Sequence, residues 1–201
     1  MRLIKKVNQL EVKRSFVVAN FISNKKDRRK HLNFVPKKVF LEKLKNAKEK
    51  VLKLKEFQLD SIIKKEWGKR LNAYNESEWY LGEVKTTEVG VWRRAGGLPL
   101  SWTNGSLAET AKKVKYAIDH NPKLLIKRSR YSIPNILRTN VNFLQKNKYL
   151  LPIIFKGGTG TKARKRLRQK MKGDIDDGCM RSIALAISGR KTLKAYIGFP
   201  K

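Results

Sequence analysis

Cysteine and histidine are nearly absent from this chain of 201 residues. The single cysteine, Cys179, excludes an intramolecular disulfide, and the two histidines, His31 and His120, lie too far apart in sequence for the ligand spacing of a structural zinc site. No apolar run approaches the roughly 20 residues that a membrane-spanning helix needs. Stretches such as 149–155 have only the length of a strand. We therefore predict no transmembrane segment.

Acidic residues are also scarce, above all in the carboxyl-terminal part. Residues 121–201 contain twenty Lys and Arg but only three acids, Asp174, Asp176 and Asp177. The whole chain has 48 Lys and Arg against 16 Asp and Glu, a formal net charge of +32. A surface this basic attracts dense polyanions. The composition therefore predicts a nucleic-acid partner, with DNA favoured over RNA, and leaves the oligomeric state open.

The amino-terminal residues 1–10 lack the apolar core and small-residue cleavage site of a secretory signal. Together with the basic composition, this favours a cytoplasmic, nucleoid-associated or virion-associated location.

Charge density divides the chain into two regions. Residues 1–120 have twenty-eight cations and thirteen acids, net +15, whereas 121–201 have a net charge of +17 in a shorter length. Hydrophobic residues make up 40% of the chain and fall in periodic blocks, so a folded core is expected. We predict that 1–120 is a basic region with a strand, a long amphipathic helix and an aromatic-rich segment, and that 121–201 is a second domain.

Within the first region, the β-favouring run at 12–22 predicts a strand, and the polar run at 23–31 predicts a basic loop. After Pro36, apolar residues recur at four-three spacing from 40 to 54, which predicts a helix that continues to 67 after a bend near 57–60. The lysines opposite this apolar stripe are either a solvated face or a face that follows phosphates.

The segment 78–102 is rich in tryptophan, and Arg93 and Arg94 directly follow one of these rings. Such aromatics either pack in the core of a β-hairpin or stack nucleobases beside the arginines. Ser106 and Glu109 have the spacing of a capping box, which predicts the start of a helix that ends near 121.

The carboxyl-terminal region begins with a short strand and basic turn at 123–130 and a helix from 132. The residues from 150 onward then predict a strand, a glycine-rich basic loop, a helix from 178 to 189 and a closing strand at 192–197. The basic residues of this region are its strongest candidates for nucleic-acid contact: Lys156, Lys162, Arg164, Lys165, Arg166, Arg168, Lys170 and Lys172, with Arg128 and Arg130.

The order of these elements resembles the ParB/sulfiredoxin-like superfamily over about residues 124–201. The residues that carry the resemblance are Pro152-Ile153-Ile154, Ile175 to Arg181 (Ile-Asp-Asp-Gly-Cys-Met-Arg), Ala184-Leu185, Gly189 and Leu193 to Gly198. The resemblance implies an α+β fold, with a small mixed sheet and flanking helices, and a phosphate site where the motif opens a helix.

The chemistry of a helix amino terminus fits this expectation, because free amides, the helix dipole and a first-turn arginine together favour a phosphate. Gly178, Cys179 and Arg181 are the candidate phosphate-binding residues. Several branches of the superfamily have histidine where this chain has Met180, so catalysis by that histidine is absent. Cys179 stands where sulfiredoxins have their nucleophile, but three nearby carboxylates oppose thiolate formation.

The three acids leave two interpretations open. Asp177 is expected to cap the helix, and Asp174 and Asp176 then neutralise nearby cations. Alternatively, Asp174, Asp176 and Asp177 are catalytic, with Asp174 and Asp176 as ligands of Mg²⁺.

The sequence therefore favours a nucleic-acid-binding protein that contacts mainly the phosphate backbone. The alternatives are a metal-dependent nuclease or nucleotide-using phosphotransferase of the same fold, with Mg²⁺ or a nucleotide as possible cofactor, and a structural virion or nucleoid component. Whether the protein is an enzyme stays open.

Overall fold

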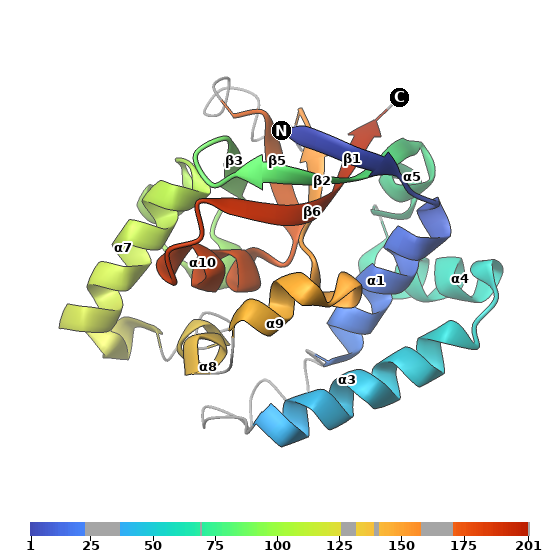
Figure 1. The fold of residues 1–201 in the computed structure, drawn as a ribbon, viewed down its shortest axis with the longest axis horizontal. Helices are drawn as coiled ribbons and strands as arrows, with labels where there is room; N and C mark the ends of the chain where they lie inside the picture. The colour runs from blue at the N-terminus through green and yellow to red at the C-terminus, as the bar shows by residue number, and fades with distance from the viewer. Residues whose placement is uncertain (23–36, 69, 126–131, 139–140, 158–170, 201) are drawn as a thin grey trace.

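The structure is a computed structural model that describes residues 1–22, 37–68, 70–125, 132–138, 141–157 and 171–200. Within these ranges a mixed sheet is packed against helices, which confirms the α+β class (Figure 1). None of the described helices combines the length and the hydropathy needed to cross a membrane.

The sheet contains strands from both halves of the chain. Its strands are β1 (Arg2–Lys6), β2 (Ser77–Lys85), β3 (Val89–Val91), β4 (Ile153–Lys156), β5 (Gly173–Asp177) and β6 (Thr192–Pro200). They lie in the order β1-β2-β6-β4-β5-β3; β6 is parallel to β4, β5 is parallel to β3, and the other neighbours are antiparallel. One sheet therefore spans the predicted boundary at residue 120.

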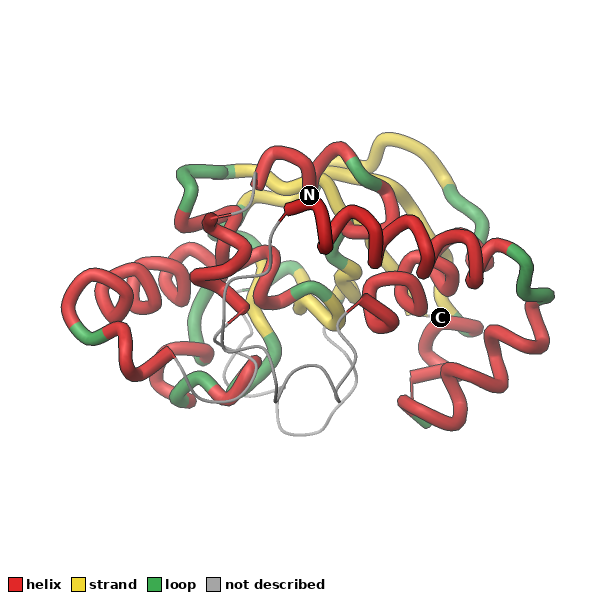
Figure 2. Tube along the Cα trace, turned by 90° about the horizontal axis from the view of Figure 1, so that it is seen from below, coloured by secondary structure: helices red, strands yellow, loops and turns green. Residues whose placement is uncertain are grey.

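The helices lie mainly on one side of the sheet. They are α1 (Gln9–Ile22), α3 (Lys37–Leu52), α4 (Glu56–Trp67), α5 (Arg70–Asn75), α6 (Leu100–Thr103), α7 (Leu107–His120), α8 (Ser132–Arg138), α9 (Val141–Lys146) and α10 (Cys179–Ile187). Figure 1 shows α1, α9 and α10 below the front strands, with α3 further out, and Figure 2 shows the same helices from below with the sheet behind them. Helix α3 packs against α1.

The strand predicted at 12–22 is wrong, because these residues form helix α1. The run Phe16-Val17-Val18 has the composition of a strand, but all three side chains are fully buried, as is Val12. A helix enclosed between the sheet and α3 needs apolar residues on most of its surface, so composition does not distinguish it from a buried strand. The basic loop predicted at 23–31 lies outside the described residues.

Helices α3 and α7 confirm their predictions. Helix α3 is described from Lys37 and buries Leu44, Ala47 and Val51, while the break before α4 falls at 53–55 rather than at 57–60. At α7, the Ser106 hydroxyl accepts a hydrogen bond from the Glu109 amide, and the Glu109 carboxylate accepts one from the Ser106 amide. Both signals are local, so the sequence alone was sufficient.

Core packing is confirmed for Trp79, but the predicted hairpin is wrong. Trp79 is 1% exposed, and its ring centroid lies 5.4 Å from that of Tyr74 and 5.2 Å from that of Phe155. Strand β2 pairs with β1 and β6, whereas β3 pairs with β5, so β2 and β3 are not neighbours.

The strand, helix and strand of the carboxyl-terminal region are confirmed as β4, α10 and β6. The acidic segment 173–177 was expected as a loop and is instead strand β5, between β4 and β3. At 122–125 the chain forms a 3-10 turn rather than a strand. The rest of that predicted strand and turn, residues 126–131, lies outside the described residues.

Candidate functional site

The candidate site lies where β5 ends and α10 begins. Gly178 is the N-cap residue of α10 and has φ +87°, a left-handed conformation that favours glycine. A Cβ at this position would also lie 3.0 Å from the Arg181 guanidinium and 3.2 Å from the Cα of Pro152. Asp177 makes no side-chain cap bond to α10, so the predicted capping role is wrong.

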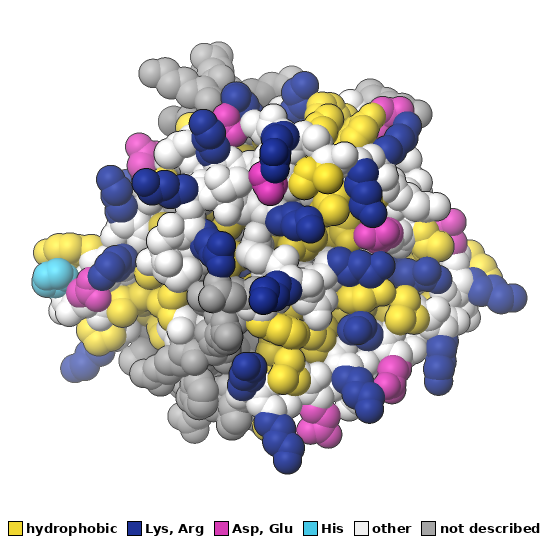
Figure 3. All heavy atoms as spheres, in the orientation of Figure 1, with side chains coloured by type: hydrophobic (Ala, Val, Ile, Leu, Met, Phe, Trp, Pro, Cys, Tyr) yellow, Lys and Arg dark blue, Asp and Glu magenta, His cyan; other side chains and the backbone are white. Residues whose placement is uncertain are grey.

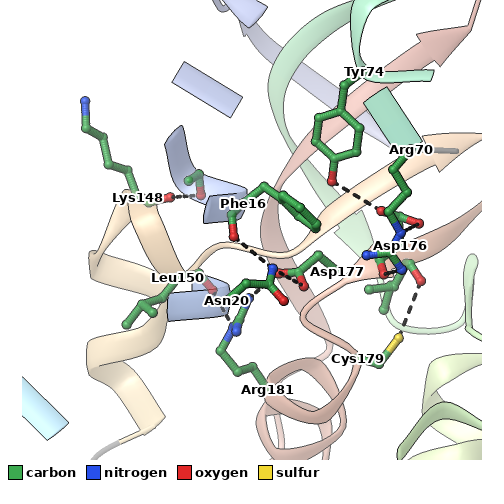
Figure 4. Close-up of polar contacts among 12 residues, drawn as sticks. Phe16, Asn20, Arg70, Tyr74, Lys148, Leu150, Asp176, Asp177, Cys179 and Arg181 are labelled. Atoms are coloured by element: carbon green, nitrogen blue, oxygen red, sulfur yellow. Dashed lines mark hydrogen bonds and ion pairs between the residues drawn. The ribbon is translucent and has the colours of Figure 1, made fainter. Parts of the chain in front are cut away.

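Asp177 instead forms an ion pair with Arg181 one turn into α10. The distance from Arg181 Nη2 to Asp177 Oδ2 is 2.8 Å, and Arg181 Nε donates to the Leu150 carbonyl at 3.1 Å. Asn20 of α1 donates to the other carboxylate oxygen at 3.3 Å (Figure 4). The Arg181 side chain is only 15% exposed. A phosphate at Arg181 would therefore have to compete with Asp177, and Arg181 as a phosphate ligand stays a prediction.

Asp176 faces the opposite side of the strand and meets α5. Arg70 Nε lies 3.4 Å from Asp176 Oδ1, and the buried Tyr74 hydroxyl donates to Asp176 Oδ2 at 3.2 Å (Figure 4). The Arg70 guanidinium also lies over the rings of Phe16 and Trp92, at 5.5 and 5.6 Å from their centroids. Cation–π contacts and the carboxylate together hold Arg70 in place.

Burial and charge shift the pKa values of both α5 residues. Burial opposes the charge of Arg70, but Asp176, Tyr74 and Asp177 outweigh it, and the pKa of the guanidinium is raised. Burial, reinforced by the Asp176 carboxylate, raises the pKa of the Tyr74 hydroxyl well above its ordinary value. At neutral pH Tyr74 is thus a hydrogen-bond donor and Arg70 a permanent cation.

The Cys179 thiol is partly buried in the first turn of α10. Its Sγ donates to the Ile175 carbonyl at 3.4 Å and accepts from the Trp92 amide at 3.5 Å. These contacts join the first turn of α10 to β5 and to the end of β3.

Asp174 is buried on the same strand, opposite Gly90 of β3 and Phe155 of β4. Magnesium binding by Asp174 and Asp176 does not fit these surroundings, because the Arg70 guanidinium already neutralises Asp176. No group of three or more His, Cys, Asp and Glu side chains able to hold a metal ion occurs among the described residues.

The predicted basic residues fall into two groups at opposite ends of β5. Arg93 and Arg94 directly follow Trp92, whose amide contacts Cys179, so they lie beside the candidate site. Lys156 and Lys172 lie at the other end, because Lys156 pairs with Gly173 and Lys172 directly precedes it.

In the second group, Lys172 is held by Glu88 and Lys156 lies over an aromatic ring. Lys172 Nζ lies 2.7 Å from Glu88 Oε1, and the Met1 amino group lies 2.8 Å from Glu88 Oε2. Both contacts lower the pKa of Glu88, to about 2, and the hydrogen bond from Lys172 has the largest effect. The Lys156 ammonium lies 4.7 Å from the centroid of the Phe199 ring.

The remaining predicted contacts lie outside the described residues: Lys162, Arg164, Lys165, Arg166, Arg168, Lys170, Arg128 and Arg130.

Arg70, Tyr74 and Asn20 were not among the residues predicted from the sequence. Arg70 and Tyr74 stand four residues apart and therefore share a helix face, which was the only local signal. Asn20 lies 157 residues from its partner Asp177, and nothing near it in sequence indicates that contact.

Neither protein-family models, nor curated proteins, nor solved structures gave a match to this chain. The ParB/sulfiredoxin-like resemblance therefore stays a prediction from the motif.

Proposed function

We propose that this protein binds nucleic acid mainly through the phosphate backbone, with DNA as the favoured partner. The observation that carries the proposal is an excess of exposed cations on the α3–α4 segment. Between residues 37 and 65 eight lysines are exposed against three glutamates: Lys37, Lys38, Lys45, Lys50, Lys53, Lys55, Lys64 and Lys65, with Glu42, Glu49 and Glu56.

Two of those glutamates are already in ion pairs. Glu49 lies 4.0 Å from Lys45, and Glu56 lies 3.0 Å from the buried Lys13 of α1. Figure 3 shows Lys and Arg side chains spread over the face that includes α3, where they outnumber the Asp and Glu side chains among them. A surface of this kind attracts a phosphate backbone and contacts it without reading sequence.

The end of β5 supports the same function in a second way. Arg181 stands in the first turn of α10, and Arg93 and Arg94 follow Trp92, whose backbone amide contacts Cys179 at the start of that helix. Arginine forks and helix amides are favourable partners for phosphate. The contacts of Asp176 and Asp177 are those of partly buried ion pairs, and they add nothing specific to the nuclease or phosphotransferase hypothesis.

Salt-dependent binding to short duplex DNA tests this proposal. For about six phosphate contacts, log K should fall against log salt with a slope near −5, since each contact contributes about −0.9. The double variant Lys38→Gln/Lys53→Gln should reduce that slope by up to about 2 units, because it removes two exposed cations of the α3–α4 segment.

The matched control is Arg2→Gln/Lys6→Gln on β1, which loses the same charge. Arg2 and Lys6 lie 2.7 and 3.4 Å from Glu83 and Glu78, so their charges are already paired and the slope should stay unchanged. Binding that ignored ionic strength would refute the proposal. Equal losses in both variants would mean a response to net charge alone, as expected for a structural virion or nucleoid component. Duplex RNA measured alongside decides the preference for DNA.

A further inference from the structure

We infer that the outer end of α7 binds an unpaired nucleobase by stacking it on Tyr116, while nearby lysines hold the adjoining phosphates. The residues of this α7 patch are Lys112, Lys113, Tyr116, His120 and Lys123. The inference rests on the proposed nucleic-acid binding and deepens it, because it adds a contact that only a single strand can make.

Tyr116 presents a flat aromatic surface to solvent. Its side chain is 66% exposed, although an apolar ring on a helix usually lies on the buried face. The buried residues of α7 are on another face of the helix and include Ala111, Val114 and Ala117. Tyr116 is therefore not part of the core that α7 helps to form.

The Tyr116 ring is held in place by a neighbouring ring. It stacks on His120, with ring centroids 4.0 Å apart and an interplanar angle of 17°. His120 Nδ1 lies 2.9 Å from the Tyr116 carbonyl oxygen, and because a carbonyl can only accept, Nδ1 carries the hydrogen and donates. The two rings form a pre-organised stack, so a base that adds to it loses little additional side-chain freedom.

Three lysines lie within about one helical turn of Tyr116 or His120 along the chain, close enough to hold phosphates beside a stacked base. Lys112 is exposed one turn before Tyr116 on the same helix stripe, and Lys123 is exposed just beyond the helix end. Lys113 Nζ donates to the Ser101 carbonyl at 2.6 Å, which fixes that cation near the surface.

The acid beside the α7 patch is neutralised locally, since Lys115 Nζ lies 2.8 Å from Asp119 Oδ2. Hydrophobic, basic, acidic and histidine side chains come together at the left edge of Figure 3, over the outer end of α7. Aromatic rings flanked by cations are the elements with which proteins hold single strands, because each base has a face that can stack and each linkage has a charge. In a duplex both faces of a base are covered by its neighbours.

The test compares a single-stranded oligonucleotide with a duplex of the same length and salt. Tyr116→Leu removes the ring but keeps an apolar side chain, and it should weaken single-strand binding about 5- to 150-fold, the effect of one lost base stack. Duplex binding should change less than twofold. The salt slope should be unchanged for both, because no charge is removed.

Two further variants make the comparison specific. Tyr116→Phe keeps the stacking ring and should retain the wild-type affinity for single strands. Ile4→Ala is the matched control, because Ile4 is a 48% exposed apolar side chain on β1, outside both the α7 patch and the α3–α4 segment, and its loss should leave single-strand affinity unchanged.

The outcomes separate the inference from the proposed function. If the wild-type protein binds both forms and Tyr116→Leu has no effect, or weakens both equally, base stacking at α7 is overturned and the proposed function stands. If the wild-type protein binds no nucleic acid, the proposed function fails and this inference fails with it.

Discussion

Replacing Asp176 by alanine removes the carboxylate that Arg70 and Tyr74 share at the end of β5. The effect of this change on stability and on turnover distinguishes a structural role of Asp176 from a catalytic one. A structural ion-pair partner should lower stability when it is lost, whereas a catalytic carboxylate should lower turnover and leave stability nearly unchanged.

The expected cost follows from what each partner loses. The Tyr74 hydroxyl is fully buried, and a buried donor without an acceptor costs about 1–3 kcal/mol. Arg70 loses its counter-ion, but its side chain is 27% exposed and partly hydrated, so we discount this contribution to about 1–2 kcal/mol. Asp176→Ala should therefore lower the free energy of unfolding by about 2–5 kcal/mol. Asp176→Asn keeps an acceptor for Tyr74 and should cost about 1–2 kcal/mol.

Urea unfolding at pH 7 measures this difference as a shift of the midpoint at constant slope. In thermal unfolding, Asp176→Ala should lower Tm by roughly 4–20 °C, at about 2–4 °C per kcal/mol for a chain of this size. The matched control is Asp119→Ala on α7, an acid in an exposed ion pair with Lys115, which should change stability by less than about 0.5 kcal/mol.

The reasoning is refuted if Asp176→Ala unfolds within about 0.5 kcal/mol of the wild type. If that variant also loses a Mg²⁺-dependent cleavage of nucleic acid, or a nucleotide-consuming activity, that the wild type has, then Asp176 is a catalytic residue.

Two further substitutions test local contacts. Because the folded pKa of Glu88 is about 2 and its ordinary value is 4.5, its stabilisation is fully present above about pH 4.5 and is lost as pH falls through 2. Glu88→Gln should lower the free energy of unfolding by about 1–2 kcal/mol at pH 7, a value that we discount because Lys172 is 58% exposed. At pH 2 the same variant should lose almost no stability. Equal losses of stability at both pH values would contradict this prediction. Ser106→Ala removes the N-cap of α7 and should lower the free energy of unfolding by about 1 kcal/mol in urea, and an unchanged midpoint would rule out a stabilising cap.

Elements with local signals were predicted correctly from the sequence. The capping box of Ser106 and Glu109 fixed the start of α7, and the apolar stripe of Leu44, Ala47 and Val51 fixed the buried face of α3. These signals come from hydrogen bonds and side-chain spacings within about four residues. They therefore do not depend on where the fold places the helix.

Helix α1 and strand β5 were predicted incorrectly for one reason. The apolar run of α1 looks like a strand, and the acids of β5 look like a loop, when each is considered alone. Helix α1 is covered by the sheet and by α3, and β5 is placed between two other strands, where Arg70 neutralises Asp176. Burial by elements distant in sequence thus overrode local preference.

The sequence by itself determined that this is a strongly basic, folded α+β chain whose three carboxyl-terminal acids stand just before Gly178. Only the tertiary structure decided what those acids do. The partners of Asp176 and Asp177 include Tyr74 and Asn20, which are 102 and 157 residues away, and the exposure of Tyr116 depends on what packs around α7. Composition indicates the net charge and periodicity indicates local secondary structure. The partner of a buried charge depends instead on which distant elements the fold brings beside it.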